Sequence, residues 1–195
     1  MESLAEVDEK DFEDALRQDP QHVRMLRILY MAFGGGVLLF AAIVIGLFYT
    51  SVGNAEGERH GIVRLLSSVH LPMALGLWLA AFMSGNFFYS PGNLKRAVNM
   101  SMSTLSGLDP TPAQKCLFVI RMAIILRIAL LEGVALFGIV ICLLGANSGA
   151  LRENPIYWLN LSSTGVLVLS LALTFPSHPR LIELFRYRFV TTRAT

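Results

Sequence analysis

Four stretches of this chain are each long and apolar enough to cross a lipid bilayer, and this feature limits the possible folds more than any other. A hydrocarbon core about 30 Å thick requires about 20 apolar residues in an α-helix. Within that core a helix satisfies its own backbone hydrogen bonds, whereas an open strand cannot. The stretches extend approximately over residues 28–49, 62–88, 117–144 and 156–175. They predict an all-α fold, an integral membrane four-helix bundle.

Composition supports the same environment, because 54% of the residues are hydrophobic and only 15% are charged. A soluble helical bundle needs a polar stripe along each surface helix, and the four stretches lack one. The formal net charge of +2 is too small to indicate a nucleic-acid partner. We therefore expect the lipid bilayer as the surroundings of the chain and no nucleic acid as a partner.

Lysine and arginine are concentrated before the first stretch, between the second and third, and after the fourth. The residues concerned are Arg17, Arg24, Arg27, Lys95, Arg96, Lys115, Arg121, Arg180, Arg186, Arg188 and Arg193. Cytoplasmic flanks of membrane helices carry such an excess of positive charge. The pattern predicts a multi-pass protein of the cell inner membrane with both termini in the cytoplasm.

These boundaries divide the chain into five predicted parts. They are an acidic cytoplasmic N-terminal segment (1–23), a first transmembrane hairpin (24–90), a cytoplasmic loop (91–115), a second transmembrane hairpin (116–178) and a basic cytoplasmic tail (179–195). Residues 2–18 are a candidate acidic helix, which we expect to be either a solvated, partly frayed tail or a segment that docks on a partner. In the tail, the apolar residues Leu181, Ile182, Phe185 and Phe189 alternate with arginines, a pattern typical of a helix in the lipid headgroup region.

Two helix starts carry capping chemistry. In residues 111–114 the hydroxyl of Thr111 can accept from the backbone, Pro112 suits the first turn, and Gln114 can reach back to the cap amide. Asn154 followed by Pro155 predicts a similar start for the fourth helix.

An offset of 97 residues aligns the first and third stretches without gaps. Arg24-Met25 then falls on Arg121-Met122, Ala32 on Ala129, Gly36-Val37 on Gly133-Val134, and Leu39-Phe40 on Leu136-Phe137. This internal repeat predicts two tandem helical hairpins, although a coincidence of glycine and phenylalanine in two apolar helices is the alternative. Glycines recur where the hairpins would touch, so Gly34, Gly35, Gly36 and Gly133 are predicted helix-packing positions.

Glu132 is the acidic residue that lies well inside a predicted span. A charge at that depth is costly, so such a group usually faces a bundle interior with a partner, or is protonated. It is either a structural hydrogen-bonding residue or a proton or ion site, with His70 as a possible relay. Arg127, on the same stretch, either extends to the headgroups or turns inward. These three residues are the candidate ion- or proton-binding set.

We predict a polar layer near mid-membrane, where the side chain of Glu132 would find a hydrogen-bond partner. Its members are Ser67, Ser68, Asn160, Ser163 and Thr164, together with His70. The other histidines lie in separate flanks or loops, so no metal site is expected. No catalytic or cofactor-binding motif is present, so we expect neither an enzyme nor a bound cofactor.

The run from Arg127 to Val140, followed by Leu143-Leu144, Asn147 and Pro176–Leu181, resembles a group of small, uncharacterised bacterial membrane proteins with four predicted helices. That resemblance implies no activity. The Glu132 run is also faintly similar to the carboxylate helix of duplicated rotary ATP synthase proteolipids. This chain differs from them in its cytoplasmic loop and in carrying the carboxylate on the first helix of its hairpin.

Three classes of function follow. The first is a non-catalytic structural or accessory subunit of a larger membrane assembly, with other membrane subunits or further copies of the chain as partners. The second is a proton- or ion-coupled translocation element that uses Glu132. The third is a membrane enzyme or transporter whose site has no recognisable motif. Missing catalytic motifs and small-residue helix faces favour the first.

Overall fold

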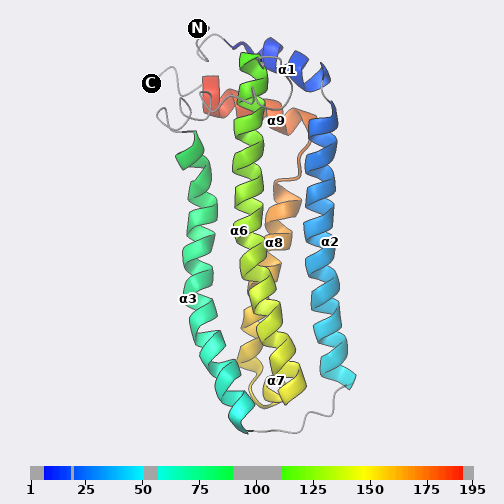
Figure 1. The fold of residues 1–195 in the computed structure, drawn as a ribbon, viewed down its shortest axis with the longest axis vertical. Helices are drawn as coiled ribbons and strands as arrows, with labels where there is room; N and C mark the ends of the chain where they lie inside the picture. The colour runs from blue at the N-terminus through cyan, green and yellow to red at the C-terminus, as the bar shows by residue number, and fades with distance from the viewer. Residues whose placement is uncertain (1–6, 19, 51–56, 90–110, 191–195) are drawn as a thin grey trace, which may run out of the picture. The chain divides into compact units, whose positions relative to one another are not determined.

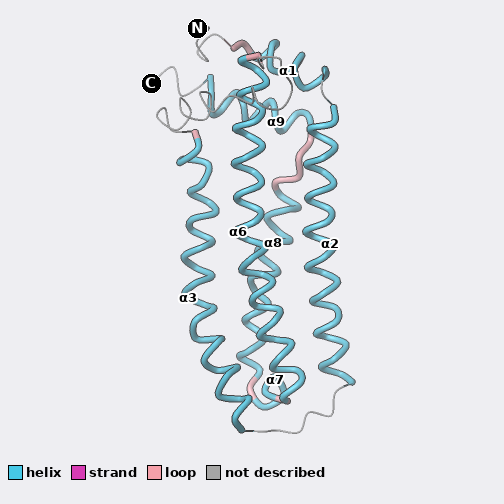
Figure 2. Tube along the Cα trace, in the orientation of Figure 1, coloured by secondary structure: helices cyan, strands magenta, loops and turns pink. Residues whose placement is uncertain are grey.

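The computed structural model describes residues 7–18, 20–50, 57–89 and 111–190, and the regular structure in these ranges is helical, without strands (Figures 1 and 2). In chain order the elements are α1 (Glu9–Gln18), α2 (Pro20–Thr50), α3 (Gly57–Phe88), α6 (Pro112–Ser148), α7 (Ala150–Glu153), the 3-10 helix η2 (Pro155–Leu161), α8 (Ser162–Leu173), α9 (His178–Phe185) and the π-helix η3 (Arg186–Val190). The predicted all-α class is therefore confirmed. Most of the predicted loop 91–115 and the start of the predicted helix 2–18 lie outside the described residues.

Four helical segments are long and apolar enough to cross a membrane, as predicted. They are Val23–Thr50, His60–Phe87, Pro112–Ser148 and Pro155–Leu173. Large apolar side chains project from their outer surfaces, among them Leu39 and Leu75, which are 62% and 64% exposed. Exposed apolar surface of this extent is unfavourable in water. The segments are thus compatible with a multi-pass membrane protein.

The described chain divides into two compact units, and α2, α3 and α6 each contribute residues to both. The first unit comprises residues 1–29, 83–127 and 175–195, and the second comprises residues 30–82 and 128–174. In the second unit, α3 is continuous through Pro72. In the most apolar part of α6, 50% of the residues are buried, whereas in that of α2 only 17% are buried. Of the two helices, α6 is therefore the more enclosed.

The core of the first unit joins α1 to α9, which lie side by side (Figure 1). The Phe12 ring stacks on the Phe185 ring at a centroid distance of 4.3 Å, and Phe185 stacks on Phe189 at 5.2 Å. Arg186 donates two hydrogen bonds to the carboxylate of Glu9, of 2.6 and 3.0 Å. Residues of α6 complete this core, Cys116 and Ile120 among them.

Two expectations about these segments are wrong. The N-terminal helix is not a frayed, solvated tail, because Phe12 and Leu16 of α1 are buried against other segments of the same chain. The apolar residues Leu181, Phe185 and Phe189 are buried in the same core instead of facing headgroups. Their four-residue spacing places them on one side of the helical segment. Phe12 and Leu16 of α1 have the same spacing and pack in the same core.

Both predicted helix starts are confirmed. The Thr111 amide donates to Gln114 Oε1 at 2.9 Å, and the Gln114 amide donates to Thr111 Oγ1 at 3.3 Å, which is a reciprocal capping box. At the fourth segment, the side chain of Asn154 accepts from the Ile156 amide at 3.1 Å. That segment differs from the single α-helix expected, because its first part is the 3-10 helix η2.

Candidate functional site

The second unit contains a buried polar cluster, and His70 of α3 is at its centre. The side chain of His70 is fully buried. Its Nδ1 atom lies 2.8 Å from Asn160 Oδ1 in η2, and its Nε2 atom lies 3.2 Å from the backbone oxygen of Val134 in α6. The Phe137 ring meets the imidazole edge-on, with centroids 5.6 Å apart. One side chain thereby connects three helical segments.

Asn160 links this histidine to the rest of the cluster. Its Nδ2 atom donates to Ser67 Oγ at 2.9 Å and to the backbone oxygen of Tyr157 at 2.8 Å. A backbone carbonyl can only accept, so the second bond fixes the orientation of the amide. The Oδ1 atom must therefore be the atom that faces His70.

The 3-10 geometry of η2 is built into the same network. Ser163 Oγ donates to the backbone oxygen of Asn160 at 2.9 Å, and the side chain of Asn160 bonds the carbonyl three residues before it. Such local side-chain bonds compete with the regular α-helical ladder. They favour the tighter turn that points Asn160 at α3.

Gly138 of α6 provides the space for this cluster, and sequence reasoning missed it. A Cβ atom there would overlap the backbone oxygen of Asn160, and would lie 2.8 Å from Ser163 Oγ and 3.0 Å from His70 Cε1. Any larger residue would have to displace η2 from α6. A glycine in an apolar helix gives no signal of this role, which depends on the placement of a distant segment.

The predicted polar layer is partly assembled. His70, Ser67, Asn160 and Ser163 come together as described. Thr164 is also buried, although its hydroxyl has no hydrogen-bond partner among the described residues. Ser68 does not belong to the layer, because it is exposed and donates to the Leu65 carbonyl of its own helix at 2.7 Å.

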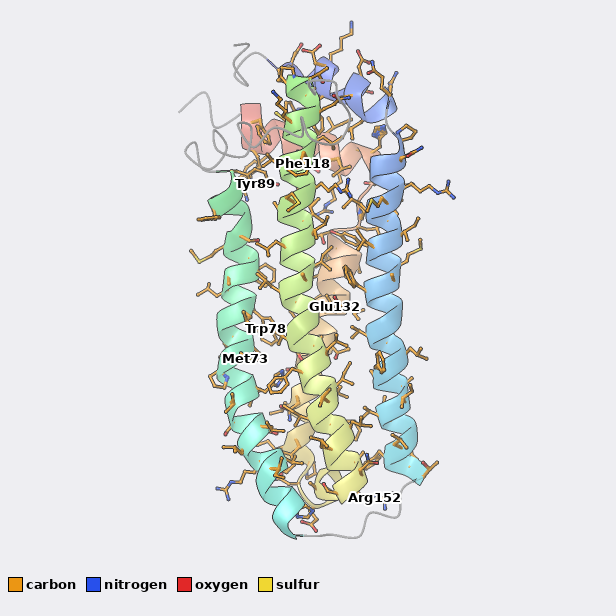
Figure 3. The ribbon with its side chains drawn as sticks, viewed as in Figure 1. Met73, Trp78, Tyr89, Phe118, Glu132 and Arg152 are labelled. Carbon is orange, nitrogen blue, oxygen red and sulfur yellow. The ribbon has the colours of Figure 1, made fainter. Side chains whose placement is uncertain are left out.

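The expectation that Glu132 bonds to this layer is wrong. Glu132, labelled in Figure 3, is on α6. Within the described part of the chain its half-buried carboxyl group makes no hydrogen bond or ion pair. Glu132 and Gly138 are six residues apart, which at about 100° per residue places them about 120° apart around α6. The helix side that meets His70 is therefore not the side that carries Glu132. The hydrogen bonds that form the cluster do not involve Arg127.

Of the four glycines predicted to pack against other helices, one is in close contact and three are not. A Cβ atom on Gly34 would lie 3.3 Å from the Leu171 side chain, so Gly34 is a point of close contact between α2 and α8. At Gly35, Gly36 and Gly133 a Cβ atom would meet nothing within 4 Å in the described chain. Among the described residues, these three glycines are therefore not points of close contact with another helix, and in that respect the prediction is wrong for them.

A hollow of about 240 Å³ borders the cluster. Its lining includes Arg64, Ser67, Asn154, Tyr157 and Asn160. Water in this hollow would reach two members of the hydrogen-bond network. Across the described ranges, no group of three histidine, cysteine, aspartate or glutamate residues is arranged to hold a metal ion.

The chain matches no protein-family model, and comparisons with curated proteins and with solved structures give no match.

Proposed function

We propose that this chain is a non-catalytic integral membrane protein that serves as a structural or accessory subunit of a larger membrane assembly. The observation that carries the proposal is the position of Glu132. It lies inside an apolar segment and has no hydrogen-bond partner among the described residues.

A carboxyl group that faces lipid leaves its polar atoms without partners. Transfer of such a group from water to an apolar medium without a compensating hydrogen bond costs roughly 2–7 kcal/mol even when it is uncharged. A membrane protein avoids this cost when another subunit supplies the donor. The missing partner of Glu132 is, in this account, a polar group on a transmembrane helix of another subunit.

The residues beside Glu132 suit a helix that comes close. Ala129 and Gly133 are exposed on α6, three residues before and one residue after Glu132. Small side chains allow helix backbones to approach in lipid, where packing and interhelical hydrogen bonds drive association. We call Ala129, Glu132 and Gly133 the α6 contact face.

The test is purification of the chain in a mild detergent, with the co-purifying subunits identified. Glu132→Gln keeps the shape and a hydrogen-bonding group, so the complex should persist. Glu132→Leu and Gly133→Leu should each reduce the recovered partner at least about tenfold, the equivalent of about 1.4 kcal/mol. Gly76→Leu is the matched control, because Gly76 is also an exposed helical glycine with open space around it.

If Glu132→Leu and Gly133→Leu retain the partner as well as Gly76→Leu does, the proposal is wrong. Recovery of a single subunit type, in a symmetric ring, would identify further copies of this chain as the occupants of the α6 contact face.

The second candidate is a proton- or ion-coupled translocation element, which the carboxyl group of Glu132 within an apolar span favours. The Gln variant separates the two candidates. A translocating carboxyl group must exchange a proton or bind a cation, so Glu132→Gln should abolish flux in reconstituted vesicles while the assembly stays intact. Unchanged flux in that variant would exclude this role for Glu132.

A further inference from the structure

We propose that the hollow between α3 and η2 binds the phosphodiester headgroup of an anionic phospholipid. The hollow has a volume of about 240 Å³, and its lining comes from residues 64–71 of α3 and residues 154–160 at the start of the fourth segment. This proposal shares with the proposed function the placement of the chain in a membrane, but it does not depend on a partner subunit at Glu132.

The hollow lies where two apolar segments begin. These segments are His60–Phe87 and Pro155–Leu173. Arg64 is four residues after the first of these starts, about 6 Å along a helix that rises about 1.5 Å per residue, and Asn154 directly precedes the second. The headgroup region of a bilayer flanks the hydrocarbon core on each side. The hollow is therefore at the depth of lipid headgroups, and the exposed side chains of Arg64 and Ile156 show that it opens outward.

Arg64 gives the hollow a positive charge. Its side chain is exposed and forms no hydrogen bond or ion pair with another described residue. The other lining residues are uncharged, and the carboxylate of Glu153, next to Asn154, lies 3.0 Å from His60 Nδ1. A guanidinium group binds phosphate through two parallel hydrogen bonds. A headgroup without an ammonium group of its own keeps its full negative charge, so the hollow should prefer an anionic phospholipid to a zwitterionic one.

A buried hydroxyl group supplies a second donor. Ser67 and Asn160 line the hollow and are only 7% and 1% exposed. Asn160 Nδ2 donates to Ser67 Oγ at 2.9 Å, so Ser67 accepts in this contact and keeps its own proton for another group. In the described chain that proton has no acceptor. A buried donor without an acceptor is unfavourable, and a phosphate oxygen in the hollow would satisfy it.

The remaining lining favours a lipid over a dissolved anion. Leu71 and Ile156 are apolar and are 39% and 59% exposed. Leu71 is seven residues beyond Arg64, so it lies about 10 Å deeper along α3. The acyl chains of a lipid whose phosphate contacts Arg64 would extend in that direction, whereas a phosphate ion would gain nothing from the apolar residues.

Native mass spectrometry of the full chain tests the proposal, with the protein released from nanodiscs of equal parts phosphatidylglycerol and phosphatidylcholine. The wild type should retain phosphatidylglycerol in preference. Arg64→Gln should retain at least about tenfold less, because it removes the charge-assisted bonds, and Arg64→Lys should retain an intermediate amount. Arg24→Gln is the matched control, since Arg24 is also an exposed arginine at the start of an apolar segment but does not line the hollow.

Equal retention of phosphatidylglycerol by the wild type, Arg64→Gln and Arg24→Gln would overturn the proposal, as would equal retention of the two lipids by the wild type. Release of the lipid by inorganic phosphate would identify a free anion as the occupant and would also overturn it. Glu132→Leu should retain the lipid as the wild type does, so that loss of the lipid and loss of the partner subunit are separate results.

Two neighbouring serines test the buried donor. Ser68 lines the same hollow, but its hydroxyl group already donates to the Leu65 carbonyl at 2.7 Å. Ser67→Ala should retain at least about threefold less phosphatidylglycerol, since it removes a hydrogen bond to a charged group, and Ser68→Ala should match the wild type. The melting temperature of each variant shows whether it is folded, and the exposed Arg64 decides the question if Ser67→Ala is not. Equal retention by the two folded serine variants would contradict the role of Ser67.

Discussion

Gly138 is the residue on which the polar cluster most directly depends. The backbone oxygen of Asn160 occupies the place that a side chain at position 138 would fill. Side-chain volume at such a point must push η2 away from α6 and lengthen the bonds around His70. Glycine is required here by close approach, since its φ is not positive.

Gly138→Ala should therefore lower the free energy of unfolding by about 1–3 kcal/mol, the usual cost of forcing a methyl group into a well-packed site. Denaturant titration in detergent micelles would measure it. Gly165→Ala is the control, because Gly165 is an exposed glycine of α8 with open space around it. That variant should be neutral or stabilised by up to about 1 kcal/mol through helix propensity. Equal effects at the two positions would contradict the close approach.

At the scale of elements, α1 and α9 are amphipathic helices that bury their apolar sides against each other. Phe12 is fully buried, and its ring stacks on that of Phe185. Short helices such as α1 are marginal in isolation and take most of their stability from packing. The docked state of α1 therefore depends on this aromatic contact.

Phe12→Ala should destabilise the docked α1 by about 3–5 kcal/mol, the usual cost of emptying a phenylalanine site. Limited proteolysis near Gln18 should become much faster, as should hydrogen exchange across α1. The exposed pair of Arg17 and Glu13, 2.7 Å apart within α1, supplies the control. Glu13→Gln should leave both rates nearly unchanged, since exposed pairs contribute little. Equal protection of α1 in the wild type and Phe12→Ala would contradict the docking.

The ion pair of the same contact predicts a pH dependence. The hydrogen bonds from Arg186 lower the pKa of the Glu9 carboxyl group below its ordinary value of 4.5. A lowered pKa means that the stabilisation is complete above that ordinary value, and is lost as the pH falls through the lowered one. The protection factor of the α1 amides, which is the exchange rate relative to that of an unfolded chain at the same pH, should fall on acidification below about pH 4.5 in the wild type. In Glu9→Gln this loss of α1 protection at low pH should disappear. If the variant loses protection at low pH as the wild type does, the assignment to the Glu9–Arg186 ion pair is contradicted.

At the scale of the whole molecule, the predicted topology places both termini in the cytoplasm. A reporter fused at Thr195 and one fused at Glu153 should therefore report opposite sides of the membrane. The physical reason is the concentration of arginine and lysine around the termini and the central loop. The same side for both fusions would contradict the orientation.

The helices were predictable because their signals are local. Apolar length identified the four long segments, and the chemistry of Thr111, Gln114 and Asn154 located two helix starts. The central cluster was predictable in part, since His70 and Asn160 are costly in an apolar segment and must find partners. Glu132 was misassigned because depth alone does not give the direction of a side chain around its helix. Gly138 and the docking of α1 depend on contacts between distant segments, for which a single sequence offers no local signal.

We propose that Glu132 and its neighbours on α6 contact a transmembrane helix of another subunit. A photo-crosslinking amino acid at Ala129, activated in the native membrane, tests it most directly. The control position is Leu79 of α3, which is 61% exposed. If another subunit covers the α6 contact face, position 129 should give a discrete protein adduct, which is lost in Glu132→Leu and kept in Glu132→Gln. Position 79 should give only lipid adducts. Lipid adducts alone from position 129 would contradict it.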